Sequence, residues 1–383
     1  AVRGLAIVVM ALDHVRDFFY ANNLRYSPTD LDSATPAVFL TRWVTNFCAP
    51  AFVLLAGVGA SLWAERGRSR RELSWFLLTR GLWLVVLELT VIRCLGWYFN
   101  FDYRDTPGQV IWAIGWSMVV LAGLVFLPRW AVAAVAVTLI AGHNQLDDVT
   151  PEAFGSLGWL WAILHSGDSL EVLPGKTFRP VYPLMPWIGV MAAGYACGHW
   201  MSPHYPHRGR FFLRVGVALT LAFLVLRGLN RYGDPEPWSV HHNALYTAFS
   251  FVNCTKYPPS LLFLLMTLGP TFLLLAWFER EGAAAPMPLV TLGRVPLFFY
   301  VVHLTVIHGL AVLLSLLHYS RADWLFVSPP WAPGSAEIYP EGYGYSLPVV
   351  YGLYVLVLLI LWPACRWYAG LKRSHHDWWL SYL

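Results

Sequence analysis

The chain has 383 residues, of which 57% are hydrophobic and only 13% are charged, and its mean hydropathy is +0.52. Soluble domains carry about a quarter charged residues, so this composition predicts an integral membrane protein. Lysine and arginine number 26 against 22 aspartates and glutamates. This small excess is clustered in short loops and does not form one basic face, which argues against nucleic acid as a partner.

A membrane-spanning helix needs about 20 mainly apolar residues, and such segments recur along the whole chain. We predict an all-α, polytopic helix bundle that forms one domain over residues 1–383. The first segment has no small-residue cleavage site after it, so we interpret it as a span and not as a signal peptide. The fifth is short, and residues 154–164 after it form a candidate re-entrant or interfacial piece. The ten expected spans are 2–21, 37–64, 74–97, 108–127, 130–143, 182–201, 211–230, 257–278, 289–317 and 347–369.

Loop charges give the expected orientation, because short cytoplasmic loops retain lysine and arginine. The loops that follow the even-numbered spans, with the tail after the last span, carry ten such residues: Arg66, Arg68, Arg70, Arg71, Arg129, Arg208, Arg210, Arg280, Lys372 and Arg373. The much longer loops on the other side carry seven. Both termini are therefore expected to be cytoplasmic, with the long acidic loops outside.

The first span contains an unusual group of ionisable residues in "MALDHVRDFF". A charge at the bilayer centre costs a few kcal/mol, so such residues should face protein or water and serve a function. His14 lies eleven residues after Arg3, which is about 16 Å along a helix. Asp17 lies one turn above His14 and could accept a hydrogen bond from its imidazole, whereas Asp13 should meet a group on another helix. The pattern indicates a candidate base with an orienting acid.

Polar residues also interrupt other spans. The ninth has Arg294 near its inner end and His303 about 13 Å above it, at a depth similar to that of His14. A single intramembrane histidine can also be a hydrogen-bonding strut between helices, and for His303 both interpretations remain open. In the second span, Pro50 cannot bond the carbonyl of Asn46 and leaves that acceptor free.

No metal site is expected. The five cysteines are scattered without paired spacing, and the pairs His204 with His207 and His241 with His242 have no carboxylate or cysteine at ligand spacing. In the third span, Glu88 and Arg93 are expected to be structural ion-pair partners, because buried charges must be compensated.

Five segments occur in an order that resembles a known family: "RGLAIVVMALDHVRDFF", "FCAPAFVLLAGVGASL", "YPLMPWIGVMAAGYACG", "KYPPSLLFLLMTLGP" and "LGRVPLFFYVVHLTVIH". They are similar to a bacterial member of the heparan-alpha-glucosaminide N-acetyltransferase family, within the wider transmembrane acyltransferase superfamily. The resemblance implies an enzyme of the bacterial inner membrane. Such an enzyme moves an acetyl group from cytoplasmic acetyl-CoA to an amine or hydroxyl of an extracytoplasmic sugar or glycan.

The resemblance also implies roles for individual residues. Arg3 would be the Arg-Gly opening of the first catalytic span, His14 its polar active-site position, and His303 the histidine after the Gly-x-x-Pro/Ser-Leu pattern. The sequence departs from the family at one point. Lysosomal relatives have asparagine at the position of His14 and a histidine in the following loop, whereas "YANNLRY" here has none. His14 would then supply the base.

Acetyl-CoA is a polyanion that ends in a thioester, so it needs cations at the cytoplasmic mouth and a base at depth. Arg3, Arg294 and Arg80 are the expected CoA-binding cations. Asp17 or Asp13 would hold the His14 tautomer, and Asn46 would donate to the developing oxyanion. Expected partners are the lipid bilayer and a glycan acceptor, with a homo-oligomer left open.

Two alternatives remain from the sequence. Buried Asp, His and Arg also build proton relays in secondary transporters, although no inverted repeat is visible. A non-catalytic scaffold would use the same residues for helix packing alone.

Overall fold

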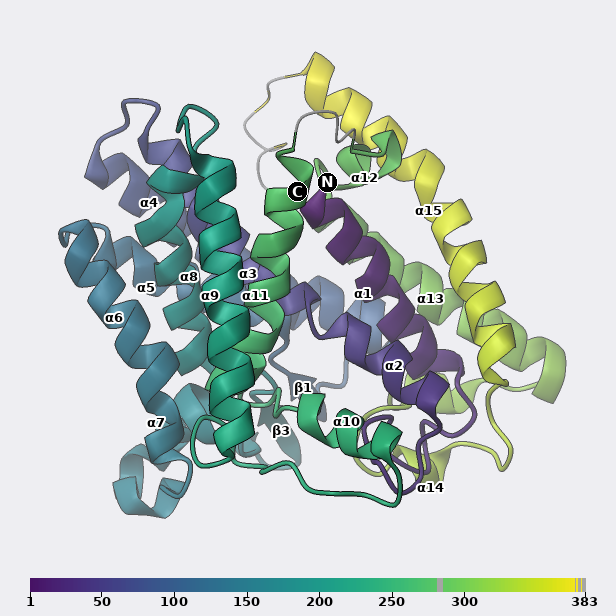
Figure 1. Ribbon diagram of the computed structural model, residues 1–383. Coiled ribbons are helices and arrows are strands. Elements are labelled where there is room, and N and C mark those ends of the chain that lie inside the picture. The colour runs from purple at the N-terminus through teal and green to yellow at the C-terminus, as the bar shows by residue number, and fades with distance from the viewer. Residues whose placement is uncertain (281–284, 376, 378–379, 381–383) are drawn as a thin grey trace. The chain divides into compact units, whose positions relative to one another are not determined.

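The computed structural model describes residues 1–280, 285–375, 377 and 380. The chain folds into two compact units. The first comprises Ala1–Cys48, Thr90–Tyr103 and Ala285–Leu383, and the second comprises Ala49–Leu89 and Arg104–Ala284. The chain is mostly helical (Figure 1), as the apolar segments predict. The expected single domain stays a prediction.

The first unit is built around helix α1 (Val2–Phe19). It packs against α2 (Pro36–Thr45), α12 (Met287–Leu292), α13 (Pro296–Tyr319) and α15 (Leu347–Ser374), which surround it in Figure 1. Ile7, Ala11, Val15 and Phe18 are fully buried, and their spacing of three to four residues forms the apolar stripe expected of a packed helix. The unit also contains most of the π-helix η1 (Glu88–Trp97), η6 (Asp323–Phe326) and α14 (Ser335–Ile338).

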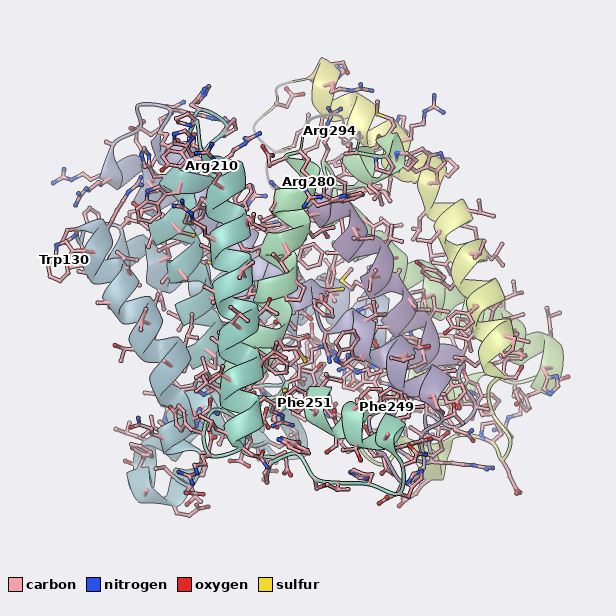
Figure 2. All side chains as sticks on the ribbon, in the orientation of Figure 1. Trp130, Arg210, Phe249, Phe251, Arg280 and Arg294 are labelled. Carbon is pink, nitrogen blue, oxygen red and sulfur yellow. The ribbon has the colours of Figure 1, made fainter. Side chains whose placement is uncertain are left out.

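The second unit contains three closely packed helix pairs, α4 with α5, α6 with α8, and α9 with α11. Arg210 at the start of α9 and Arg280 just after α11 lie at the same end of this unit, and Phe249 and Phe251 of α10 lie at the other end (Figure 2). The bounds are α3 (Cys48–Ala64), α4 (Arg70–Leu87), α5 (Val110–Leu124), α6 (Arg129–Gly142), η2 (His143–Leu146), α8 (Leu184–Cys197), η5 (Gly198–Met201), α9 (Arg208–Leu229), α10 (Ala244–Val252) and α11 (Leu261–Phe278).

The loops of the second unit form structure that the sequence did not predict. Strands β1 (Asp105–Pro107), β2 (Leu170–Leu173) and β3 (Lys176–Arg179) make a small sheet in the order β1-β3-β2. β1 runs parallel to β3, and β2 runs antiparallel to it. The candidate re-entrant piece, residues 154–164, lies within the short turns η3 (Pro151–Leu157), α7 (Gly158–Trp161) and η4 (Ala162–Ser166).

Among the described residues, six helices are long and apolar enough to cross a membrane. They are Pro36–Ala64, Arg70–Trp97, Arg208–Leu229, Leu261–Phe278, Pro296–Tyr319 and Leu347–Ser374. The protein is therefore a membrane helix bundle, whereas ten spans and cytoplasmic termini stay predictions.

Proline residues explain two helix breaks inside segments that the apolar pattern predicted as continuous spans. The expected span 37–64 is interrupted at Asn46 and Phe47, because the ring of Pro50 clashes with the Asn46 carbonyl in a continuous helix. The expected span 289–317 is interrupted between α12 and α13, where Pro296 takes the first helical position that suits its fixed φ.

A glycine allows α1 to approach α12 closely. A Cβ on Gly4 would lie 1.9 Å from the carbonyl oxygen of Leu289, so Gly4→Val should force the two helices apart and destabilise the protein by about 1–3 kcal/mol. The control is Gly309→Ala on α13. No atom lies within 4 Å of a Cβ added at Gly309, and alanine favours a helix. Thermal unfolding in detergent should show a lower Tm for Gly4→Val only. Equal Tm values would contradict this packing.

Candidate active site

Two histidines meet inside the first unit. His14 comes from α1 and His303 from α13, and their ring centroids are 5.3 Å apart. His303 is fully buried, whereas the His14 side chain is 13% exposed. The structure therefore brings together the two histidines that the sequence placed at a similar depth, one fully buried and the other partly exposed.

The surroundings of His303 define its tautomer. Nδ1 lies 2.6 Å from the carbonyl oxygen of Tyr300 and 3.1 Å from that of Phe299. A carbonyl only accepts, so Nδ1 carries the proton and donates it, and in the neutral ring Nε2 is an acceptor. Among the described residues, the buried Nε2 has no hydrogen-bond partner. Such an atom suggests a substrate contact, because leaving it unpaired costs about 1–3 kcal/mol.

The His14 ring lies next to a carboxylate, Asp17, and an aromatic side chain, Trp97. Its Nδ1 lies 3.7 Å from a carboxylate oxygen of Asp17, which is ion-pair range but longer than a hydrogen bond. The expected hydrogen bond is thus a looser contact. Trp97, from η1, meets the His14 ring edge-on at a centroid distance of 5.0 Å. With Nδ1 turned toward Asp17, Nε2 is the nitrogen available to a substrate.

Two arginines compensate the two acids of α1. Arg16 is 2% exposed, and its guanidinium lies 2.8 Å from Asp13 and 2.5 Å from Asp17. Arg42, on α2, lies 3.3 Å from Asp13. Asp13 thus meets another helix, as its position on α1 suggested. Two carboxylates with two guanidiniums form a neutral network that a low-dielectric site tolerates.

Arg42 links this network to Asn46. Its guanidinium donates to the side-chain oxygen of Asn46 over 3.2 Å and to the hydroxyl of Thr45 over 2.9 Å. Asn46 is buried at the point where α2 ends. The amide oxygen of Asn46 is thus engaged, and its amide nitrogen is a hydrogen-bond donor, the kind of group that stabilises an oxyanion.

The expected CoA-binding cations divide between the units. Arg3 and Arg294 are both exposed in the first unit. A Cβ on Gly293, next to Arg294, would lie 3.6 Å from the Cβ of Arg3 at the start of α1, and Figure 2 labels Arg294. Arg80 belongs to α4 in the second unit, and its guanidinium lies over the Phe76 ring. A role for Arg80 stays a prediction.

A hollow of about 410 Å³ opens beyond the last turn of α1. Its lining is Ala21, Asn22, Leu24, Arg25, Ala336, Tyr339, Pro340, Glu341, Gly342 and Tyr343. The Tyr343 hydroxyl donates to the Phe18 carbonyl over 3.0 Å, which fixes this wall to α1. Burial, together with neighbouring tyrosines, raises the pKa of Tyr339 and Tyr343 well above that of a free phenol, so both stay neutral.

Sequence reasoning missed several of these residues. Trp97, Tyr339 and Tyr343 look like the aromatic anchors that are common at membrane interfaces, and only the tertiary structure brings Trp97 against His14. Arg16 had a detectable signal: it lies three residues after Asp13 and next to Asp17, within pairing distance on a helix. His308, by contrast, is a strut, because its two nitrogens face the carbonyls of Gly96 and Leu325.

Removing Arg16 should destabilise the protein. Arg16→Met leaves Asp17 and part of the Asp13 pairing uncompensated, which costs about 3–5 kcal/mol for a buried pair. The control is Arg68→Met, which breaks an exposed pair with Glu72 and should cost less than about 1 kcal/mol. The free energy of unfolding in detergent measures both. A similar loss for the two variants would contradict the buried network.

The comparison with protein families identifies the chain. A model described as heparan-alpha-glucosaminide N-acetyltransferase, catalytic, matches residues 1–229. This range includes α1, Asn46 and Arg80, whereas Arg294 and His303 lie beyond it. No curated protein matches the chain. Because the match covers more than half of the residues, this integral membrane protein belongs to the heparan-alpha-glucosaminide N-acetyltransferase-like family, a family of membrane acetyltransferases.

Proposed function

We propose that the protein transfers an acetyl group from cytoplasmic acetyl-CoA to an amine or hydroxyl of a sugar on the other side of the membrane. The observation that carries this proposal is the pair His14 and His303. His303 presents a buried Nε2 that has no hydrogen-bond partner in the described part of the chain, and it lies beside the partly exposed ring of His14. Family membership supports acetyl transfer. The donor, the acceptor and the roles of individual residues are our inference.

The donor would bind at the start of α1. Arg3 and Arg294 are exposed there, and guanidinium groups bind phosphates through short, charge-assisted hydrogen bonds. His14 lies eleven residues further along α1, about 16 Å away. The pantetheine arm of CoA is a long, uncharged chain, so this separation suits a nucleotide held at the cations with its thioester beside His14.

The acceptor would enter from the other end of α1. Ala21, in the hollow, lies seven residues beyond His14, about 10 Å along the chain direction. The hollow is lined by Asn22, Arg25, Glu341 and neutral tyrosines, which offer the donors, acceptors and ring faces that sugars bind. Apart from Ala21, which ends the first expected span, its residues come from two loops that the charge count assigns to the outer side.

The chemistry needs a base, a positioned nucleophile and an oxyanion donor. His14 Nε2 takes the proton of the acceptor hydroxyl or amine as that group attacks the thioester carbonyl. His303 Nε2 accepts a hydrogen bond from the second N–H of an amine acceptor, or from a neighbouring hydroxyl of the sugar when the reacting group is itself a hydroxyl, and so orients the acceptor. The tetrahedral oxyanion receives a hydrogen bond from the Asn46 amide. Its collapse breaks the carbon–sulfur bond, and the proton on His14 passes to the leaving thiolate, which gives free CoA.

The central prediction concerns His14. Purified protein in liposomes, supplied with radiolabelled acetyl-CoA and an amino sugar, should release CoA and form labelled acetyl-sugar. His14→Ala should lower the rate by about 10²- to 10⁴-fold, the usual contribution of a general base.

The control for this test is His318→Ala, an exposed histidine in the last turn of α13, which should keep the wild-type rate. His303→Gln should lower the rate as His14→Ala does, with acetyl-CoA affinity unchanged. Wild-type protein that neither binds acetyl-CoA nor releases CoA with any amino sugar would overturn the proposal, as would a His14→Ala variant of full activity.

The cationic end makes a separate prediction. Arg3→Ala and Arg294→Glu should each weaken CoA binding by about ten- to hundredfold, because a hydrogen bond to a charged group contributes about 1.5–3 kcal/mol, while the rate at saturating donor changes little. Arg321→Ala is the control, since Arg321 follows the far end of α13 and pairs with Asp323. Calorimetry with CoA measures the affinities. Unchanged affinity in both variants would contradict this donor site.

A further inference from the structure

The second unit holds a cluster of potential metal ligands that the acetyl-transfer proposal does not use. His143, Asp147 and His165 place one ligand atom each within 4.8 Å of one another. His143 starts η2, directly after α6, and His165 lies in the π-helical turn η4. Two segments that are separate in the chain therefore converge on one point.

The histidines of this cluster are buried without adequate partners. His143 is 1% exposed and His165 is 2% exposed. Within the described part of the chain, neither nitrogen of His143 nor Nδ1 of His165 makes a hydrogen bond of good geometry. The backbone of Pro259 is a weak hydrogen-bond partner of His143. Each such atom costs about 1–3 kcal/mol when nothing satisfies it. A bound cation would satisfy the nitrogens that face the cluster centre.

The acid of the cluster is oriented as a ligand. The Asn144 amide donates to one oxygen of Asp147 over 2.8 Å, and the other oxygen lies 3.2 Å from Nε2 of His165. That separation is close to the ligand–ligand distance of about 3.3 Å in a tetrahedral zinc site, where metal–nitrogen bonds are about 2.0–2.1 Å long. Asn144 then acts as the supporting contact that fixes a ligating carboxylate.

We propose that His143, Asp147 and His165 bind a divalent transition metal of the Zn²⁺ or Co²⁺ class. Imidazole with carboxylate is the donor set of such ions, and two histidines with one acid leave a fourth position for water. Asp147 is partly exposed, which gives the ion a way in. The ion joins the end of α6 to η4 and stabilises the loop between them.

The sequence contained a signal for this site. His143 and Asp147 are four residues apart, which puts two ligands on one face of a helical turn. His165 has no such spacing to either residue, so only the fold completes the set.

The test uses the full-length protein in detergent, freed of affinity tags and dialysed against a chelator. Added Co²⁺ should give the visible absorption of a tetrahedral site, and elemental analysis after Zn²⁺ loading should find one ion per chain. Zn²⁺ should also raise the Tm. Asp147→Asn and His143→Gln should each lower metal affinity by at least about tenfold and remove the Tm increase.

His241→Ala with His242→Ala is the matched control, because this pair lies in a loop of the same unit and should leave binding unchanged. Asp147→Asn keeps both buried rings, so it stays informative if His143→Gln does not fold. Wild-type protein that takes up no Co²⁺ or Zn²⁺ at micromolar concentration would overturn the proposal. Uptake that is the same in Asp147→Asn and wild type would also overturn it.

Discussion

The compensation of charge inside α1 is the constraint on which the candidate site depends. Asp13 and Asp17 lie in a mainly apolar helix, and Arg16 and Arg42 neutralise them. Breaking one partner of a buried network is far more costly than breaking a surface pair, so these four residues hold one arrangement. That arrangement sets Asp17 beside His14 and joins α1 to α2. The network is thus structural and, in our account, positions the base.

The three parts of the proposed reaction site, for the donor, the catalytic histidines and the acceptor, follow one another along α1. Exposed cations lie at its start, His14 faces His303 in its interior, and the hollow with Tyr339 and Tyr343 lies beyond its end. Gly4 lets α12 pack closely at the cationic end, and the Tyr343 hydroxyl fixes the hollow to the Phe18 carbonyl. If the donor and the acceptor arrive from opposite sides of a membrane, their binding sites must lie at opposite ends of such a helix, with the catalytic residues between them.

The sequence predicted the helices better than it predicted their contacts. The length of each apolar segment predicted the long helices, and the family resemblance predicted the enzyme class, because both depend on local sequence patterns. The sequence indicated the freed Asn46 carbonyl near Pro50, but the continuous apolar pattern predicted an unbroken span there and another across Pro296. The meeting of His14 with His303, and of Trp97 with His14, depends on packing between distant segments. No local pattern encodes such contacts, and the small sheet and the approach of His165 to His143 and Asp147 were missed for the same reason.

The most direct measurement is the position of the donor thioester in an experimental structure with a non-hydrolysable acetyl-CoA analogue. The account predicts the nucleotide phosphates against Arg3 and Arg294 and the acetyl carbon beside the imidazoles of His14 and His303. An analogue bound with its acetyl carbon away from both rings, while the phosphates are well ordered, would contradict the account.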